Sequence, residues 1–448
     1  MTNHYDIIIL GGGNAGFGVS AVAAEAGKRI AFVESADFGG TCPNRGCTPK
    51  KVLVAAAHAL HEIELAAEHG ITVGAPSLDW SKLIARERAM VDFIPDAMAG
   101  VAGKRGDVYR GEARFTGPNS IDVNGETLDA ENIVIATGSK PRALPITGAD
   151  LMITSDEVLS DDVQPEEVIF IGGGVIALEF AHVYQRAGTN VTILEVMPQL
   201  LPNMDVDAVA VVRSETERLG VKVHTGAVVK GVVRTGDRLT VQVEVDGQAQ
   251  TLNADRVING AGRVANVDTL DLAAGNVQHD GAAIELDDFL RSTTNPSVWV
   301  AGDALVRSAQ LSPFATYEGR IVGRNIVEGP TVKPDYAVVP GAVFTVPAFA
   351  TVGLTERAAA DAGIEVRVEI NDMREWFSGK SYAETVAWAK VLIDRKTDEI
   401  VGAHLVGHHG EELIHTFALA MRHGITASAL RDSFFAFPTF SSDIKNLL

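Results

Sequence analysis

Cysteine, positive charge and long apolar runs are scarce in this sequence, and each scarcity excludes a class of protein. The 448 residues carry a formal net charge of −20 and no basic block, so nucleic acid and anionic lipid are poor partners. No apolar run approaches the roughly 20 residues of a membrane helix, and the first residues lack the basic stretch of a secretory signal. We expect a cytoplasmic protein that binds neither nucleic acid nor membrane.

The chain has two cysteines, Cys42 and Cys47. Cytosolic thiols are kept reduced, so the sequence favours a catalytic pair over a structural disulfide, with inert core thiols as the alternative. In a regular helix, Cα atoms five residues apart are roughly 8–9 Å apart at a rise of ~1.5 Å per residue, but a disulfide needs about 7 Å or less. The backbone should therefore leave regular helix here, helped by Pro43, Gly46 and Pro49. A cysteine near a helix N-terminus with basic neighbours should also have a lowered pKa.

Glycine is plentiful, with 44 residues, and much of it follows apolar runs. The run Tyr5–Leu10 predicts a strand that leads into a G-x-G-x-x-G fingerprint and an Ala-rich helix; a second strand, Ile30–Val33, ends at Glu34. The fingerprint residues are Gly11, Gly13 and Gly16. Such glycines let the backbone approach a pyrophosphate at the helix N-terminus, and the carboxylate accepts hydrogen bonds from a ribose.

The same unit recurs later, with alanine in the last fingerprint position. The strand Val168–Ile171 precedes it, and the strand Val191–Leu194 ends at Glu195. Its fingerprint residues are Gly172, Gly174 and Ala177. In both units the carboxylate follows the first glycine by 23 positions. Two such units with one spacing predict that the chain binds two dinucleotides.

Three further strand endings are rich in small residues: Thr137-Gly138, Gly260-Ala-Gly262 and Gly302-Asp303. Each is typical of a chain that crosses between domains near a bound cofactor, although an ordinary turn would explain any one of them. From about Asp335 the cofactor signatures end, which predicts an α+β module. Its predicted strands are Val343–Val346, Val366–Ile370, Val386–Ile393 and Ile400–Val406, and its predicted helix is Glu411–His423.

The segment Gly39-Gly-Thr-Cys42-x4-Cys47-x-Pro-x-Lys51 resembles the pyridine nucleotide–disulfide oxidoreductases, the flavoprotein disulfide reductases. The resemblance covers essentially the whole chain. Its further motifs are the two fingerprints, Ala136-Thr-Gly-Ser139, Gly262-Arg263 with Asn266, Ala301-Gly-Asp303, Leu311-Ser-Pro313, Val343-Phe-Thr345 and Val352-Gly-Leu-Thr-Glu356.

The resemblance implies an α/β fold with two Rossmann-like domains, for FAD and NAD(P), and a C-terminal α+β dimerisation domain. The FAD domain is expected at residues 1–145 and 265–335, the NAD(P) domain at 146–264 and the dimerisation domain at 336–448. A homodimer follows, because in this family the active site receives its C-terminal segment from the partner.

The resemblance also implies roles for single residues. Cys47 would be the thiol nearest the flavin and form a charge-transfer pair with it, and Cys42 would be the interchange thiol that meets the substrate. Lys51 and Glu179 match an ion pair beside the flavin, with surface charges as the alternative interpretation. The positions implied to hold FAD are Gly11, Gly13, Gly16, Glu34, Thr41, Thr137, Gly138 and Asp303.

The second fingerprint is implied to hold the nicotinamide nucleotide, through Gly172, Gly174, Glu195 and Gly262. Glu195 repels a 2′-phosphate, and the residues after it, Val196–Gln199, supply no arginine to accept one. This favours NADH over NADPH, although NADPH stays possible.

The sequence departs from the family pattern at its C-terminus. Reductases of this family carry His-Pro-Thr-x-Ser-Glu, whose histidine protonates the leaving thiol, but here Phe437 replaces the histidine and Ser442 the glutamate. Neither is a usable general acid, and such a loss typically costs roughly 10²–10⁴-fold in rate. The candidate replacements, each with a plain surface role as its alternative, are His408, His409, His415 and His423.

We therefore expect an FAD-dependent NAD(P)H:disulfide oxidoreductase that passes electrons through Cys42 and Cys47 to a small or protein disulfide. A flavin reductase of a quinone, metal ion or oxygen is the alternative enzyme. A flavin-bound redox sensor without turnover is the alternative that is not an enzyme.

Overall fold

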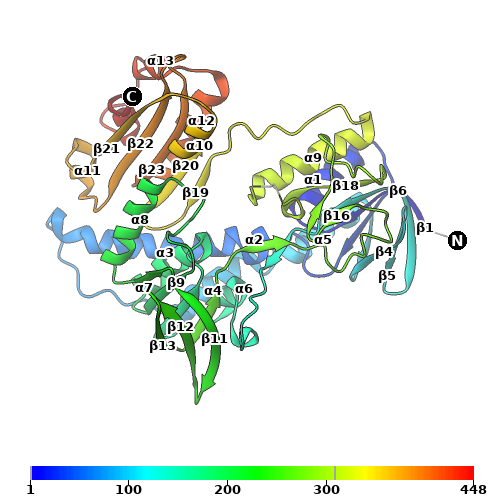
Figure 1. Ribbon diagram of the computed structural model, residues 1–448, viewed down its shortest axis with the longest axis horizontal. Helices are drawn as coiled ribbons and strands as arrows, with labels where there is room; N and C mark the ends of the chain where they lie inside the picture. Colours follow the sequence, from blue (N-terminus) through cyan, green and yellow to red (C-terminus); the bar gives the residue numbers. More distant parts are fainter. Residues whose placement is uncertain (1–2, 307–308) are drawn as a thin grey trace. The chain divides into compact units, whose positions relative to one another are not determined.

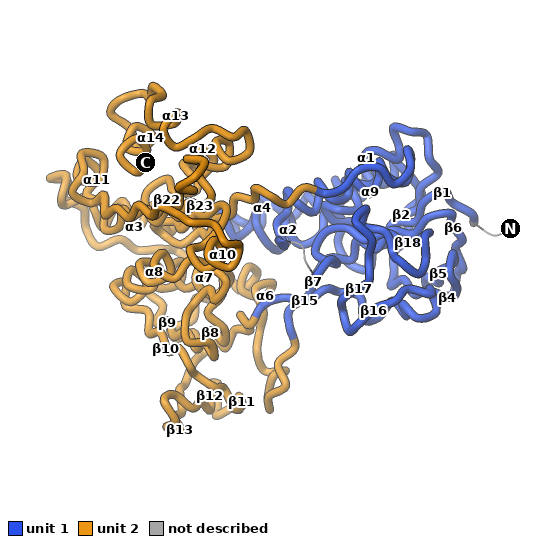
Figure 2. Tube along the Cα trace, turned by 45° about the horizontal axis from the view of Figure 1, so that its top comes forward, with its two compact units in different colours: residues 1–51, 85–142, 262–334 blue, residues 52–84, 143–261, 335–448 orange. Residues whose placement is uncertain are grey.

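The computed structural model describes residues 3–306 and 309–448 (Figure 1). The chain divides into two compact units, each built from three separate segments (Figure 2). Unit 1 comprises Met1–Lys51, Ala85–Arg142 and Gly262–Pro334, and unit 2 comprises Val52–Ile84, Ala143–Ala261 and Asp335–Leu448. Within the described residues, no helix has the length and hydropathy needed to cross a bilayer.

Unit 1 is built on a seven-stranded sheet in the order β3-β2-β1-β6-β5-β4, with β18 also paired to β6. The strands are β1 (Asn3–Leu10), β2 (Ile30–Glu34), β3 (Asp107–Arg110), β4 (Ala113–Gly117), β5 (Ser120–Val123), β6 (Glu126–Ile135) and β18 (Val298–Val300). The pairs around β1, β2 and β6 are parallel, whereas β4, β5 and β6 pair antiparallel. Ile7, Ile8 and Ile9 of β1 are fully buried, as expected of a parallel strand covered on both faces.

Helices α1 (Asn14–Glu25) and α9 (Ser312–Glu328) pack side by side in unit 1 (Figure 1). Glycines allow the close contact, because a Cβ on Gly319 would lie 2.1 Å from the Ala15 carbonyl oxygen and one on Gly18 would lie 2.5 Å from that of Thr316. The two helices therefore begin close together at the same edge of the sheet, where the parallel strands end.

The remaining elements of unit 1 are α2 (Thr41–Arg45), the start of α3 (Cys47–Leu65), the end of α4 (Trp80–Val91), α5 (Ile94–Arg105), β7 (Ser139–Pro141), β15 (Arg263–Ala265), β16 (His279–Asp280), β17 (Ala283–Ile284) and the 3₁₀ turn η3 (Gly302–Ala304). The chain passes between the units within α3 and within α4.

Unit 2 contains a parallel sheet in the order β10-β9-β8-β14. Its strands are β8 (Glu167–Ile171), β9 (Asn190–Glu195), β10 (Lys222–Thr225) and β14 (Arg256–Asn259), and its helices are α6 (Ser155–Ser160), α7 (Val175–Arg186) and α8 (Val206–Arg218). A three-stranded antiparallel sheet, β11 (Val228–Thr235), β12 (Arg238–Val245) and β13 (Gln248–Ala254), was not predicted. The two sheets predicted from the fingerprints, one in each unit, are confirmed as Rossmann-like.

The C-terminal part of unit 2 is an antiparallel sheet in the order β19-β20-β23-β22-β21, packed against α12 (Gly410–His423). The strands are β19 (Gly341–Val343), β20 (Ala348–Gly353), β21 (Val366–Asp372), β22 (Ala387–Asp394) and β23 (Ile400–Gly407). The other helices are α10 (Glu356–Asp361), α11 (Phe377–Tyr382), α13 (Ala427–Arg431) and α14 (Phe440–Asp443). The predicted α+β module is confirmed.

The predicted strand Val343–Val346 is wrong, because β19 ends at Val343 and the next strand begins only at Ala348. Side chains of α7 take the backbone N–H groups that a strand would use. Phe344 N donates to Glu179 Oε1 at 2.8 Å, and Val346 N donates to His182 Nδ1 at 3.1 Å. Apolar residues alone could not reveal this competition.

A buried lysine joins three elements of unit 2. Lys390 of β22 is fully buried, and its Nζ lies 2.9 Å from Asp205 Oδ2, 2.7 Å from Asp207 Oδ2 and 3.3 Å from Glu356 Oε1. Asp205 also caps α8 by accepting hydrogen bonds from the Asp207 and Ala208 N–H groups. The lysine therefore ties the sheet of the C-terminal module to the first turns of α8 and α10.

We predict that Lys390→Ala lowers the free energy of unfolding by about 3–5 kcal/mol, because it leaves a buried carboxylate without its cation. The matched control is Lys333→Ala, whose partner Asp288 lies 2.7 Å away while both side chains are more than half exposed, so its cost should stay below about 1 kcal/mol. Urea unfolding followed by circular dichroism measures both. Equal shifts for the two variants would contradict a structural role for the buried cluster.

Candidate functional site

The two cysteines lie on either side of a helix break. Helix α2 ends at Arg45, Gly46 adopts φ −146° and ψ −114°, and α3 begins at Cys47. A Cβ on Gly46 would lie 2.9 Å from the Thr41 carbonyl oxygen. The predicted departure from regular helix is confirmed, and it brings the Cys42 and Cys47 side chains within hydrogen-bonding distance.

The pKa of Cys42 is lowered to about 6, first by a hydrogen bond from the Cys47 side chain. The Ser312 hydroxyl, the Cys47 backbone N–H and the charge of Lys50 act in the same direction, and partial burial opposes them. A thiol with this pKa is mostly thiolate at neutral pH, which is the nucleophilic form.

Ser312 was not predicted as a site residue, although the motif that contains it was recognised. Ser312 is the first residue of α9, and Asn14 is the first residue of α1. Asn14 Nδ2 donates hydrogen bonds to the hydroxyl and the carbonyl oxygen of Ser312. Helix N-termini carry partial positive charge, so the starts of α1 and α9 both favour an anion at this point. Asn14 fixes the hydroxyl that Ser312 offers to Cys42.

The first fingerprint forms a cradle that only glycine can build. Gly11 has φ +116°, and a Cβ on it would lie 2.2 Å from the Ala136 carbonyl oxygen; one on Gly16 would lie 2.1 Å from the Gly11 carbonyl oxygen. A Cβ on Gly13, by contrast, would have its nearest atom 3.7 Å away. Space is therefore left above Gly13 at the N-terminus of α1, where a pyrophosphate is expected.

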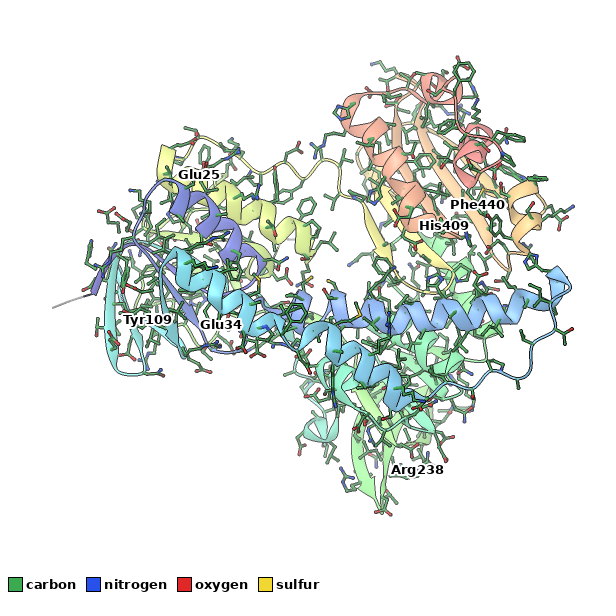
Figure 3. The ribbon with its side chains drawn as sticks, turned by 180° about the vertical axis from the view of Figure 1, so that it is seen from behind. Glu25, Glu34, Tyr109, Arg238, His409 and Phe440 are labelled. Carbon is green, nitrogen blue, oxygen red and sulfur yellow. The ribbon has the colours of Figure 1, made fainter. Side chains whose placement is uncertain are left out.

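Glu34 is held at the end of β2 (Figure 3). Its carboxylate accepts hydrogen bonds from the backbone N–H groups of Gly12, at 2.6 Å, and Ala36, at 2.7 Å. The side chain is thereby fixed beside the cradle in the position suited to a ribose.

The second fingerprint repeats this geometry in unit 2. Gly172 has φ +109°, and a Cβ on it would lie 2.4 Å from the Gly260 carbonyl oxygen, whereas over Gly174 the nearest atom would be 3.8 Å away. Glu195 is buried and accepts hydrogen bonds from the Gly173 N–H and, at 2.7 Å, from the Met197 N–H. These contacts match those of Glu34, so both carboxylates serve the same structural role.

The other residues predicted to hold FAD gather in unit 1. Asp303 Oδ2 accepts a hydrogen bond of 3.0 Å from the Ser139 hydroxyl, and Arg263 also donates to that hydroxyl. Burial raises the pKa of Asp303, although Ser139 and Arg263 act to lower it. The Thr137 hydroxyl is buried, and the described residues offer it no hydrogen-bond partner. A ligand with hydrogen-bonding groups would satisfy it, so these residues fit FAD.

Three more predicted residues lie at turns or helix starts. Gly138 and Gly262 have φ +70° and +94°, and a Cβ on either would meet no atom within 4 Å. Thr41 is the first residue of α2. Their part in cofactor binding stays a prediction.

Lys51 and Glu179 belong to different units. Lys51 is exposed and is the last residue of the first segment of unit 1. Glu179 lies on α7 of unit 2, is 5% exposed and accepts the hydrogen bond from Phe344. The burial excludes the surface-charge interpretation of Glu179, while its ion pair with Lys51 stays a prediction.

The C-terminal segment exposes large aromatic side chains. Phe434 is 100% exposed and Phe437 83%. Ser442, which stands at the glutamate position, closes a capping box with Thr439 at the start of α14. The segment itself therefore offers no acid at these two positions.

The four candidate histidines are placed differently. His408 Nδ1 lies 2.8 Å from Glu384 Oε1, and the His409 ring packs edge-on against His408 with 3.8 Å between ring centroids. His415 and His423 are exposed on α12. Glu384, which lies between α11 and β22, was not predicted, because nothing in the local sequence indicates its partner.

Comparison with known proteins identifies the family. The model of the pyridine nucleotide-disulphide oxidoreductases matches residues 5–319, and that of their dimerisation domain matches residues 339–448. The chain is 34% identical to a dihydrolipoyl dehydrogenase of Rhizobium etli over 99% of this chain and 97% of that protein. It is 32% identical to a glutathione reductase of Burkholderia cepacia, with 99% and 98% covered.

A mercuric reductase of Bacillus cereus is 31% identical over 98% of this chain and 70% of that protein. Among solved structures, the HOCl-induced flavoprotein disulfide reductase RclA from Escherichia coli superimposes with a TM-score of 0.87 and 27% identity, covering 99% of each chain. Its complex with Cu(II) gives 0.88 and 26%, over 100% of this chain and 99% of the other.

These matches cover both nucleotide-binding sheets, the cysteine segment and the C-terminal module. The chain belongs to the pyridine nucleotide-disulphide oxidoreductases, flavoenzymes that use FAD and NAD(P)H to act on sulfur groups.

Proposed function

We propose that this enzyme reduces a disulfide substrate with electrons from NADH, through FAD and the Cys42–Cys47 pair. The observation that carries the proposal is the lowered pKa of Cys42, about 6. Cys47 contributes most to this lowering, and Ser312 and Lys50 add to it. When bound, FAD supplies the chemistry of accepting a hydride and delivering an electron pair to a disulfide.

The first cradle, with Glu34, Thr41, Thr137, Gly138 and Asp303, would hold FAD. The second cradle, with Glu195 and Gly262, would hold the nicotinamide nucleotide. Lys51 and Glu179 would form an ion pair near the flavin. Support comes from the glycine contacts that leave room over Gly13 and Gly174, and from the unsatisfied Thr137 hydroxyl.

The sulfur chemistry follows from the two thiols. The Cys42 thiolate attacks one sulfur of the substrate disulfide, a mixed disulfide forms, and the first substrate sulfur leaves as a thiolate that takes up a proton. Cys47 then attacks Cys42 Sγ, loses its proton to the second leaving sulfur and closes the Cys42–Cys47 disulfide. The substrate gains two electrons and two protons, and NADH loses a hydride.

We propose a small disulfide as the substrate class, which the names of the dihydrolipoyl dehydrogenase and glutathione reductase relatives support. We also propose a homodimer. The matched dimerisation domain supports it. The exposure of two large aromatic side chains of one short segment, Phe434 and Phe437, also supports it, since exposed apolar patches mark interaction surfaces. In that dimer the C-terminal segment of one subunit meets the cysteine pair of the other.

An anaerobic titration of the purified protein with NADH tests the relay. The two-electron-reduced pair holds one proton for two hydrogen-bonded sulfurs, so in part of the molecules Cys47 would be the thiolate beside the flavin. We therefore predict a long-wavelength absorption band after one two-electron equivalent, and loss of that band in Cys47→Ser. Bleaching of the flavin without the band would remove the cysteines from the relay and favour a quinone, a metal ion or oxygen as acceptor.

We predict that iodoacetamide alkylates Cys42 of the reduced protein with a rate that rises to a plateau around a midpoint near pH 6. Ser312→Ala should move the midpoint upward, because it removes one hydrogen bond to the thiolate. The control is Ser297→Ala, whose hydroxyl contacts Asn119 instead. Trypsin cleaves after Arg45, so mass spectrometry separates the Cys42 and Cys47 peptides. A midpoint near pH 8.5, the ordinary range of a thiol, would contradict the stabilised thiolate.

Glu195→Gln should raise the ratio of kcat/KM for NADPH to that for NADH by about 10-fold, because it removes a fixed negative charge facing the 2′-position. Glu34→Gln is the matched control, since Glu34 makes the same contacts in the other cradle; it should weaken FAD retention and leave the ratio unchanged. Steady-state kinetics with both nucleotides measure the effect. An unchanged ratio in Glu195→Gln would contradict the assignment.

A further inference from the structure

A histidine and a buried glutamate form an ion pair next to the C-terminal segment. His408 follows β23 directly, and its Nδ1 lies 2.8 Å from Glu384 Oε1, with side chains 17% and 2% exposed. The second carboxylate oxygen, Oε2, is buried and has no hydrogen-bond partner among the described residues. The glutamate therefore interacts chiefly with His408, and it holds the ring through Nδ1 so that Nε2 is left to meet another group.

The His408 ring packs on the C-terminal segment itself. It stacks on Phe440 with 5.0 Å between ring centroids and 23° between planes, and Tyr382 lies against it at 5.0 Å. Figure 3 shows Phe440 and the neighbouring His409 in this part of the C-terminal module. Phe440 follows Phe437 by three positions, so the imidazole lies beside the segment whose own histidine is missing.

The surroundings favour the protonated form of His408. Burial alone would lower its pKa, but the hydrogen bond and charge of Glu384, with Glu62 and Glu411, raise it above the ordinary value. The pKa of His409 is lowered, by burial and by the charge of His408. Of these two adjacent rings, His408 is thus the one whose protonated form the surroundings favour.

We propose that His408, oriented by Glu384, is the general acid that protonates the leaving thiolate and so replaces the histidine absent at position 437. The inference rests on the proposed function, which brings this segment to a cysteine pair. The C-terminal segment has Phe437 and Ser442 where the family pattern has a histidine and a glutamate. His408 and Glu384, which lie elsewhere in the C-terminal module, supply an imidazole and a carboxylate.

The proton transfer is a single step. When the Cys42 thiolate breaks the substrate disulfide, the leaving sulfur carries the released electron pair and accepts the proton from Nε2 of the His408 imidazolium. The histidine becomes neutral while Glu384 keeps Nδ1–H in place, and solvent returns the proton before the next turnover. No oxidant or further reactant is needed.

The test compares two disulfides whose leaving thiols differ in acidity. His408→Asn should lower kcat/KM at least about 10²-fold for an alkyl disulfide such as oxidised glutathione or lipoamide, whose leaving thiolate is basic and needs a proton. With 5,5′-dithiobis(2-nitrobenzoate), whose aromatic thiolate is a good leaving group, the loss should stay within about threefold, because a general acid contributes little there.

Three variants sharpen the comparison. His423→Asn, on the exposed last turn of α12, is the matched control and should change neither rate. Glu384→Gln keeps the shape of the side chain but removes its charge. It should therefore lower kcat/KM for the alkyl disulfide, by less than His408→Asn does. This variant replaces His408→Asn in the test if that variant does not fold. Phe437→His in the His408→Asn background should restore part of the lost rate.

Equal losses with both disulfides in His408→Asn, or no loss with either, would overturn the role of His408 while leaving the proposed function intact. In both cases the NADH-driven absorption band of the variant, which precedes the acid step, should match that of the wild type. If the wild-type enzyme reduces neither disulfide, the proposed function fails, and this inference fails with it.

Discussion

The hydrogen bonds onto the Cys42 sulfur are the interaction on which the rest of the site depends. They come from Cys47, five residues away, and from Ser312, which is 270 positions away in sequence. The bond from Cys47 depends on the helix break at Gly46. The bond from Ser312 depends on α1 and α9 beginning together, which in turn requires the glycine contacts between these helices. Stabilising one thiolate therefore constrains the backbone of two helices and explains why glycine occupies the places where larger residues would stabilise a helix better.

The cofactor-binding frame could be predicted from the sequence because its signals are local. Each fingerprint, its strand and its carboxylate lie within about one βαβ unit, and the structure shows the same contacts at Glu34 and Glu195. Prediction failed where distant residues decide the outcome. The end of β19 is set by the side chains of Glu179 and His182, and no window of sequence around Val343 contains either of them.

The same reason explains which site residues were missed. Ser312 was recognised only as part of a motif, and Glu384 was not recognised at all, because their roles come from contacts with Cys42 and His408 that the fold creates. The departure at Phe437 was visible in the sequence, but the sequence could not single out the histidine that we propose as the replacement acid. Four histidines were equivalent candidates there, and only the structure distinguishes one that is paired with a buried carboxylate from two that are exposed on a helix surface.

The bracing of Glu195 by two backbone N–H groups has a consequence for how this enzyme can change over evolutionary time. A carboxylate on a mobile side chain could move away from the 2′-phosphate of NADPH, so it would discriminate only weakly between NADH and NADPH. Movement of the Glu195 carboxylate would break its hydrogen bonds to the Gly173 and Met197 N–H groups, so under the proposed preference for NADH this relaxation would be unfavourable. If the proposed preference for NADH holds, tolerance for NADPH would come through substitution of Glu195, and the new residue would also have to support the turn that Glu195 holds.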